Sequence, residues 1–238
     1  MPPERGDPAG ARLPLILRRL KRTYPDARIA LEFSTPLECV VATILSAQST
    51  DVGVNQVTRT LFQKYRRPQD YLAVPEEELQ ADIHATGFFR QKTRALRGMA
   101  QRLIEAYDGE VPRTIAELLT LPGVARKTAN IVQANCWPEI ARRDPGAGMA
   151  VDTHVGRVAV RLGLTPRGSK EAERIEQDLI ALIPKKNRLP ATNLFIEHGR
   201  RVCLAKAPRC ADCVVEPLCP SSQEAGLPDL YRVTARSR

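Results

Sequence analysis

The stretch LPGVARKTANI (residues 121–131) places two cations, Arg126 and Lys127, in the first turn of an expected helix. The helix dipole is already positive there, so the placement is electrostatically unfavourable. A neighbouring cation, the dipole and burial all favour the neutral form of a lysine amine. Because a neutral amine is the nucleophile that forms Schiff bases, we predict that Lys127 is shielded from solvent and acts as a nucleophile. The alternative is that both cations bind phosphate groups.

The turn before this helix suits an anion site. Pro122 fixes one backbone angle and Gly123 permits a left-handed or tight conformation, so the N–H groups that follow point outward at a helix start. A DNA phosphate would be stabilised there by the amides and the dipole together, without readout of base sequence. We therefore predict DNA contacts from Gly123, Val124, Ala125 and Arg126.

A carboxylate with a possible chemical role lies further along the chain. The apolar stripe in MAVDTHVGRVAVRLG (residues 149–163) predicts a helix with Asp152 at or near its N-cap. Capping holds a carboxylate rigidly, and the same group can stabilise a cationic transition state or relay a proton if the fold brings it near Lys127. His154 is either a partly buried, hydrogen-bonded imidazole or a contact to the substrate.

Four of the six cysteines form the pattern Cys-x6-Cys-x2-Cys-x5-Cys: Cys203, Cys210, Cys213 and Cys219. In a reducing compartment, four thiolates this close together predict a metal centre, and they suit structural zinc as well as an iron–sulfur cluster. Lys206 and Arg209 lie inside the pattern and are either phosphate contacts or a solvated pair. The remaining cysteines, Cys39 and Cys136, stand alone in apolar contexts.

The composition agrees with a nucleic-acid partner. The chain has 238 residues, with 36 Lys and Arg against 27 Asp and Glu, and a net charge of +9 attracts polyanions. No run of 18 apolar residues exists, which excludes a transmembrane helix, and the N-terminal residues do not resemble a secretory signal. We expect an intracellular protein.

The elements that position these residues are expected to be short helices, so the fold class is all-α. Capping boxes begin helices at Thr35 and Thr114, each with a Glu three residues later. The segment 141–150 is rich in Gly, Pro and charge, and suits a mobile loop between two helical halves.

Taken together, the motifs resemble the endonuclease III family of DNA glycosylases, in the helix-hairpin-helix superfamily. LPGVARKTAN is similar to its hairpin, VDTH to its catalytic aspartate segment, the cysteine pattern to its 4Fe-4S loop, and LSAQSTD (residues 45–51) to a segment that approaches DNA. The match runs from about residue 29 to residue 220. The resemblance implies that Lys127 is the Schiff-base nucleophile, Asp152 the catalytic carboxylate, and Gln48 the residue that fills the gap left by an extracted base. It also implies that the four cysteines ligate a 4Fe-4S cluster.

The resemblance also implies an architecture of two helical domains that flank a DNA-binding cleft. These are a six-helix domain with the hairpin (residues 29–140) and an iron–sulfur domain (residues 1–28 with 141–220). Residues 221–238 are expected to form a basic, loosely ordered tail. The expected partner is double-stranded DNA that carries damaged bases or abasic sites, without a membrane. The expected state is a cytoplasmic, nucleoid-associated monomer.

The chain departs from the family pattern in three places. Ala125 replaces a usual glycine, which removes a phosphate contact if the position needs a positive φ. Phe88, in GFFRQK (residues 87–92), stands where a leucine often wedges into the duplex, and either residue can unstack bases. The loop before Asp152 is longer than usual.

The predicted function is that of a bifunctional glycosylase and abasic-site lyase that removes oxidised pyrimidines by base flipping, Schiff-base formation and β-elimination. One alternative is a glycosylase for mismatched adenine, thymine or uracil. Adenine-removing relatives use a glutamate just upstream of the Gln48 segment, and residues 40–47 contain no carboxylate. The other alternative is a non-catalytic DNA-binding redox sensor, which has no need of Lys127 together with Asp152.

Overall fold

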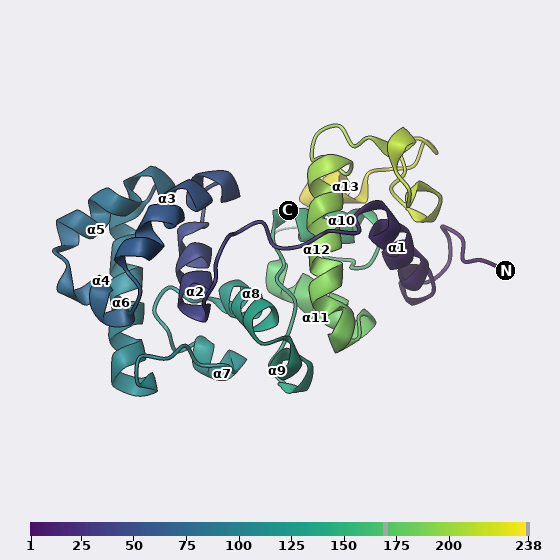
Figure 1. Cartoon of the computed structure of the whole chain (residues 1–238). Coiled ribbons are helices and arrows are strands. Elements are labelled where there is room, and N and C mark those ends of the chain that lie inside the picture. The colour runs from purple at the N-terminus through teal and green to yellow at the C-terminus, as the bar shows by residue number, and fades with distance from the viewer. Residues whose placement is uncertain (169–170, 237–238) are drawn as a thin grey trace. The chain divides into compact units, whose positions relative to one another are not determined.

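The computed structural model of the chain describes residues 1–168 and 171–236, and every regular element in these residues is a helix (Figure 1). The all-α prediction is confirmed. The chain divides into two compact units, one made of residues 30–147 and the other of residues 1–29 with 148–238.

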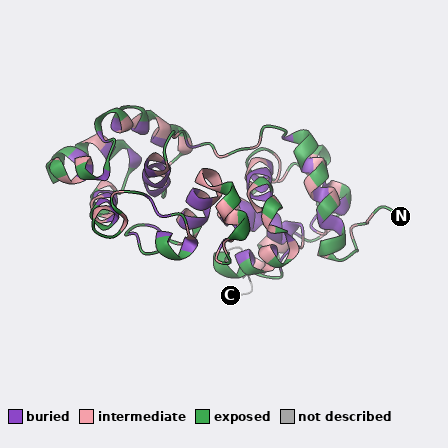
Figure 2. Ribbon diagram, turned by 60° about the horizontal axis from the view of Figure 1, so that its bottom comes forward, coloured by how far each residue is buried: buried purple, intermediate pink, exposed green. Residues whose placement is uncertain are grey.

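The unit of residues 30–147 holds eight α-helices and one short 3-10 helix, more than the six helices expected. They are α2 (Pro36–Leu45), α3 (Asp51–Lys64), α4 (Pro68–Ala73), α5 (Glu76–Ile83), η1 (His84–Thr86), α6 (Phe89–Tyr107), α7 (Ile115–Leu118), α8 (Arg126–Cys136) and α9 (Pro138–Arg143). Helix α2 begins at the predicted capping box, in which Thr35 and Glu38 bond to each other's backbone N–H groups. All its residues from Cys39 to Leu45 are buried, so it forms the centre of this unit (Figure 2).

The second unit is built around α10. Its elements are α1 (Ala9–Thr23), α10 (Thr153–Arg161), α11 (Ala172–Leu182), α12 (Lys185–Arg201), η2 (Cys210–Asp212), η3 (Glu216–Leu218) and α13 (Leu230–Arg236). The apolar stripe of α10 is fully buried at Val155, Val158 and Ala159, where it packs with residues of α1, α11 and α12. Burial of such side chains contributes about 1.5–3 kcal/mol each to folding.

The prediction of a loosely ordered tail after Pro220 is wrong for the described residues. Ser221, Ser222 and Asp229 are buried, and α13 follows them. The cause is an ion pair that sequence patterns do not reveal. Both carboxylate oxygens of Asp229 accept hydrogen bonds from the Arg161 guanidinium, at 3.0 and 2.9 Å, and this anchors the tail to α10.

The segment 141–150 is also more ordered than its composition suggests. Asp144 accepts hydrogen bonds from the backbone N–H groups of Ile115 and Gly146, both at 2.8 Å. Ala147 and Met149 are buried. The boundary between the units falls inside this segment, but the residues on each side of it are held by their own unit.

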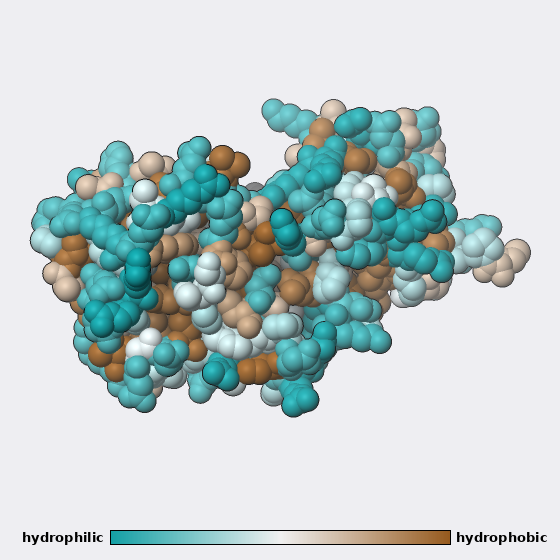
Figure 3. All heavy atoms as spheres, in the orientation of Figure 1, coloured by the Kyte–Doolittle hydropathy of each residue, from teal (hydrophilic) through white to brown (hydrophobic). Residues whose placement is uncertain are grey.

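Hydrophilic side chains cover most of the face seen in Figure 3, as the charged composition suggests. Among the helices of the described residues, none is both long and apolar enough to cross a membrane.

Candidate nucleic-acid interface and cysteine-lined pocket

The hairpin that leads into α8 has a conformation that only glycine tolerates at one position. The preceding helix α7 begins at the predicted capping box of Thr114 and Glu117, and ends at Leu118. Gly123 has φ +78°, and a Cβ added to it would lie 2.8 Å from the Cβ of Ala95. Glycine is therefore required twice, by the backbone angle and by the close approach of α6.

Ala125 is the N-cap of α8 and has φ −85° and ψ 172°, an extended conformation that any residue adopts. The position does not have the positive φ under which alanine in place of glycine was expected to remove a phosphate contact. The first backbone hydrogen bond of α8 runs from the Ala129 N–H to the Ala125 carbonyl. Amides earlier in the first turn have no partner within the helix, so the geometry suits an anion.

The side chains at the start of α8 differ in their exposure to solvent. Lys127 is exposed, so the prediction that it is shielded from solvent is wrong for the free protein. Arg126 is half-buried and donates from Nη2 to the Gly146 carbonyl at 3.3 Å. Val124 is buried and its N–H donates to the Leu121 carbonyl, so its side chain is unavailable to DNA.

Gln48 and Phe88 share an unusual backbone conformation. In the described part of the chain, three non-glycine residues have positive φ: Gln48 (53°), Phe88 (48°) and Asp108 (52°). Asp108 is the C-cap of α6, where a left-handed residue is common. Gln48 and Phe88 are both exposed, Phe88 at 58%. Left-handed backbone costs a non-glycine residue roughly 1–2 kcal/mol, and such strain collects at functional sites.

Phe88 and its neighbour Phe89 differ in their surroundings. Phe89 is half-buried and packs against His84, with ring centroids 4.5 Å apart. Phe88 projects from the turn before α6 and packs against no other ring in the described residues. Its position is compatible with a wedge into stacked bases.

A buried lysine connects the Gln48 and Phe88 loops, and sequence reasoning missed it. Lys92 is 5% exposed, and its Nζ donates to the carbonyls of Leu45 and Thr86, both at 2.8 Å. Burial lowers the pKa of Lys92. The sequence did contain a signal for its burial. Lys92 stands four residues before Leu96, so it lies on the apolar face of α6.

Helices α2 and α8 pack side by side and run in opposite directions. At one end, a Cβ added to Gly123, just before α8, would lie 3.5 Å from Ile44, near the end of α2. At the other end, the side chain of Cys136, the last residue of α8, raises the pKa of Cys39 in the first turn of α2. The loop of Gln48 follows α2 and Lys127 begins α8, so both lie at the same end of the helix pair.

Asp152 lies in the other unit and is the N-cap of α10, as predicted. Its Oδ1 accepts a hydrogen bond from the Val155 N–H at 2.7 Å, and the side chain is half-buried. The second carboxylate oxygen makes no hydrogen bond within the described residues. A rigid carboxylate with one unused edge is available for electrostatic or proton-transfer roles.

His154 is half-buried and hydrogen-bonded, which was the structural alternative for this residue. Its Nδ1 lies 3.1 Å from Nη2 of Arg157, and burial is the main cause of a lowered pKa for His154. Arg157 also donates to the carbonyls of Gly199 and Cys203, at 2.9 and 2.8 Å. His154 is therefore placed by an arginine that joins α10 to α12 and to the first cysteine of the cluster pattern.

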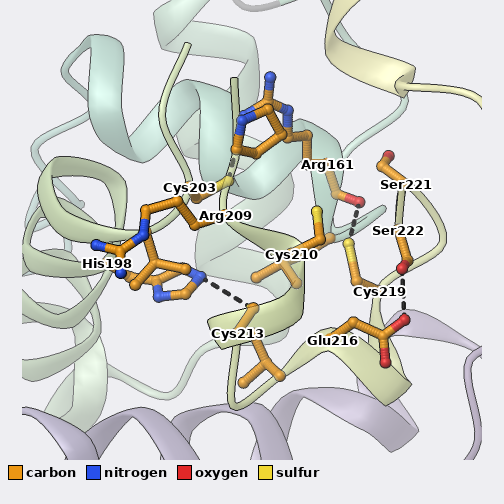
Figure 4. Close-up of a pocket in the computed structure, with 14 residues that line it drawn as sticks. Arg161, His198, Cys203, Arg209, Cys210, Cys213, Glu216, Cys219, Ser221 and Ser222 are labelled. Carbon is orange, nitrogen blue, oxygen red and sulfur yellow. Dashed lines mark hydrogen bonds between the residues drawn. The ribbon is translucent and has the colours of Figure 1, made fainter. Parts of the chain in front are cut away.

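The four cysteines of the pattern line one pocket (Figure 4). Two buried residues contact their sulfurs, Arg161 through Nη1 to Cys203 at 3.4 Å and His198 through Nε2 to Cys213 at 3.5 Å. The Cys219 thiol donates to the Arg161 carbonyl at 3.3 Å. Burial raises the pKa of Cys203 above its usual range, and raises the pKa values of Cys213 and Cys219 to about 12 each.

Arg161 also holds the chain beyond the first cysteine, because it donates to the carbonyls of Leu204 and Ala205 at 2.6 and 3.0 Å. The next predicted DNA contacts, Lys206 and Arg209, are both exposed. Arg209 pairs with Asp212 at 2.7 Å, so part of its charge is already balanced. Such exposed pairs contribute little to stability and open readily for another partner.

Comparison with known proteins gives this arrangement a context. Residues 41–185 match the profile of the HhH-GPD superfamily of base excision DNA repair proteins. Endonuclease III of Synechocystis sp. is 46% identical over 208 residues, which are 87% of this chain and 91% of that protein. Two solved structures, a non-covalent endonuclease III–DNA complex and a trapped endonuclease III–DNA covalent intermediate, each share 39% identity and a TM-score of 0.83. Each covers 91% of this chain and 98% of the solved chain.

Proposed function

Because the chain belongs to the HhH-GPD superfamily of base excision DNA repair proteins, we propose that it excises oxidised pyrimidines from double-stranded DNA. It is a bifunctional DNA glycosylase and abasic-site lyase. One observation carries the choice of site. The exposed Lys127 begins α8 at the end of the α2–α8 pair where Gln48 also lies, and Lys92 links the Gln48 loop to that of Phe88.

Base flipping is the first step. A damaged base pairs and stacks poorly, so it leaves the duplex at less than the few kcal/mol that a normal base requires. Phe88 would unstack the neighbouring bases and Gln48 would fill the gap. Both residues have positive φ, a strained conformation of the kind that collects at functional sites.

Chemistry follows at the sugar. The neutral amine of Lys127 attacks C1′, the C1′–N bond breaks, and the base leaves with the bonding electron pair and accepts a proton. The nitrogen lone pair then forms the C1′=N bond as the C1′–O4′ bond breaks, and O4′ takes up a proton. The resulting imine acidifies C2′–H, and loss of a C2′ proton expels the 3′ phosphate by β-elimination. Asp152 would stabilise positive charge at the sugar and assist the proton transfers. Because Lys127 is exposed in the free protein, its shielding from water is supplied by the bound duplex.

The hairpin amides and the basic side chains would bind the phosphates. The backbone at Gly123 and Ala125, with the side chains of Arg126, Lys206 and Arg209, would position the duplex without reading its sequence. His154 is a further candidate contact. Relatives solved with DNA support this assignment.

We propose a 4Fe-4S cluster for the cysteine-lined pocket. All four thiols line one pocket, and four thiolates are the ligand set that holds a 4Fe-4S cluster. When bound, the cluster cross-links the four thiolates and thereby fixes the loop that presents Lys206 and Arg209.

Reductive trapping tests the nucleophile. Borohydride reduces the imine, so the wild-type protein should become covalently attached to DNA that carries thymine glycol. Lys127→Ala should abolish this attachment and lower the lyase rate by roughly 10³-fold or more, while DNA binding stays measurable. Arg126→Ala is the matched control, since it removes the adjacent cation and keeps the amine. Trapping that persists in Lys127→Ala would show that another amine reacts.

A panel of lesion duplexes tests the substrate class. We expect base loss and strand scission with oxidised pyrimidines, and neither with mismatched adenine, thymine or uracil. Comparison with and without hot alkali separates base removal from backbone cleavage. Binding without cleavage of any duplex would favour the redox-sensor alternative. A brown protein with a visible absorption band identifies iron rather than zinc, and sedimentation tests the expected monomer.

A further inference from the structure

Two consecutive hydrogen bonds lead from the cysteine-lined pocket to the end of α1. The Nε2 atom of His198, in α12, lies 3.5 Å from the sulfur of Cys213, and its Nδ1 atom lies 3.2 Å from the hydroxyl of Tyr24. Figure 4 shows the first of these contacts between the two labelled side chains. His198 and Tyr24 are both buried, so water does not compete for either bond.

The chemistry of the three partners fixes the direction of each hydrogen bond. A neutral imidazole carries a hydrogen on one ring nitrogen and accepts with the other, and the burial of His198 favours this neutral form. A cysteine sulfur that binds a metal atom is a thiolate, which accepts a hydrogen bond and cannot donate one. Nε2 of His198 therefore carries the hydrogen and donates to Cys213, while Nδ1 accepts from the hydroxyl of Tyr24.

Tyr24 is itself held in place by contacts that do not involve its hydroxyl. Its backbone N–H donates to the Leu20 carbonyl at 2.8 Å, which makes it the C-cap of α1. The Arg201 guanidinium lies over its ring, 5.5 Å from the centroid. The ring centroids of Tyr24 and His198 are 6.1 Å apart. The hydroxyl is thus presented to Nδ1 of His198 by a ring whose position is already determined.

We propose that His198 raises the reduction potential of the bound 4Fe-4S cluster by donating a hydrogen bond to the ligand Cys213, with Tyr24 as the positioning residue that holds the imidazole. The inference rests on the proposed cluster. A hydrogen bond to a ligand sulfur disperses its negative charge, and this stabilises the more negative, reduced state of the cluster. Donation from Tyr24 strengthens the Nε2–H donor, because consecutive hydrogen bonds polarise one another.

A second side chain, Arg161, also donates to a sulfur of the pocket, that of Cys203 at 3.4 Å. Arg161 is in addition paired with Asp229 and bonded to backbone carbonyls, so its replacement would disturb the fold as well as the pocket. His198 contacts the pocket as an uncharged donor. It is therefore the residue at which the effect of a hydrogen bond on the cluster can be measured with less disturbance of the fold.

Voltammetry of the full-length, iron-loaded protein tests the proposal. His198→Leu replaces the donor by an apolar side chain of comparable size, so the reduction potential should fall. The equilibrium constant for reduction should drop at least roughly threefold, or about 28 mV for one electron. His198→Gln keeps an N–H donor and should recover part of this loss. A rise or no change of the potential in His198→Leu would overturn the proposal.

Tyr24→Phe removes only the hydroxyl and should lower the potential by less than His198→Leu does. In the His198→Leu background the same change should cause no further fall, because Tyr24 acts through His198. Equal shifts in the two backgrounds would overturn the role of Tyr24. Tyr71→Phe is the matched control, since it removes a buried hydroxyl that donates to the Tyr65 carbonyl in the other unit, and it should leave the potential unchanged.

Fe–S stretching bands compared in H₂O and D₂O report the hydrogen bond itself. The isotope shift should shrink in His198→Leu and persist in His198→Gln, and an undiminished shift in His198→Leu would contradict the assigned donor. If His198→Leu does not fold, Tyr24→Phe still tests the proposal, because it keeps the packing of the ring. A protein that binds no iron would overturn the cluster together with this inference. Iron-loaded wild type and variants of equal potential would overturn the inference alone.

Discussion

The two units hold their candidate functional residues by opposite means. In residues 30–147, Gln48, Phe88 and Lys127 are exposed, and one buried lysine fixes the loops of the first two from beneath. In the other unit, Arg157 and Arg161 are themselves buried. Their guanidinium groups donate hydrogen bonds to backbone carbonyls and to the sulfur of Cys203. The first arrangement leaves side chains ready for an outside partner, whereas the second holds a loop in place.

The role of a positively charged side chain therefore depends on its burial. An exposed cation such as Lys127 remains available to react or to bind phosphate. A buried cation such as Arg161 has a structural role, because removal of any of its hydrogen-bond partners leaves an unsatisfied polar group away from water. Four substitutions test this difference, and their expected effects on the free energy of unfolding decrease from Arg161 to Gln48.

Arg161→Met should have the largest effect. It leaves the Asp229 carboxylate, 7% exposed, with only the longer contact to the half-exposed Arg232 at 3.5 Å as an ion pair, and breaking a buried ion pair costs about 3–5 kcal/mol. Urea denaturation measures the loss. Arg167→Met is the matched control, since its pair with Asp178 is far more exposed and such pairs contribute about 0–1 kcal/mol. Equal losses in the two variants would contradict the assigned role of burial.

Lys92→Met should have the second-largest effect on the free energy of unfolding. The carbonyls of Leu45 and Thr86 lose their shared donor, and an unsatisfied buried polar group costs about 1–3 kcal/mol. Because both loops lose their anchor, binding of lesion duplex should weaken as well. Arg94→Met on the exposed face of the same helix is the control and should stay within about 0.5 kcal/mol of the wild type. Unchanged DNA binding in Lys92→Met would show that the loops hold their shape without it.

Gly123→Ala should destabilise the hairpin by about 1–3 kcal/mol, because a positive φ and an overpacked contact add together. Gly87→Ala separates the two contributions. Gly87 also has positive φ, but a Cβ there meets no atom within 4 Å, so only the backbone cost remains. Thermal melts of both variants give the comparison, and an equal loss in each would remove the argument from the Ala95 contact.

Gln48→Gly should have the smallest effect on stability and the opposite sign. Glycine relieves the left-handed strain, so the free energy of unfolding should rise by at most about 1 kcal/mol. Excision of a damaged base should nevertheless slow, because nothing fills the gap. Gln48→Ala loses the same side chain and keeps the strain, so it should slow excision without the gain in stability. Unimpaired excision in both variants would remove Gln48 from the interface.

Sequence patterns predicted the features that depend on neighbours within a few residues. The all-helical class and the capping boxes at Thr35 and Thr114 are confirmed, and Asp152 is the N-cap that its apolar stripe predicts. The crowding of the four cysteines was likewise visible from spacing. The roles of Lys127, Asp152 and the DNA-facing residues came from resemblance and stay predictions.

Only the tertiary structure decided which groups are buried and which meet. Lys92 and Leu45 are 47 positions apart and Arg161 and Asp229 are 68 apart, and the packing of distant helices brings each pair together. The same packing leaves Lys127 exposed. The physical reason is the range of the interactions. A helix cap or a cysteine spacing is complete within one turn or loop, whereas the desolvation of a charge depends on every element that packs around it.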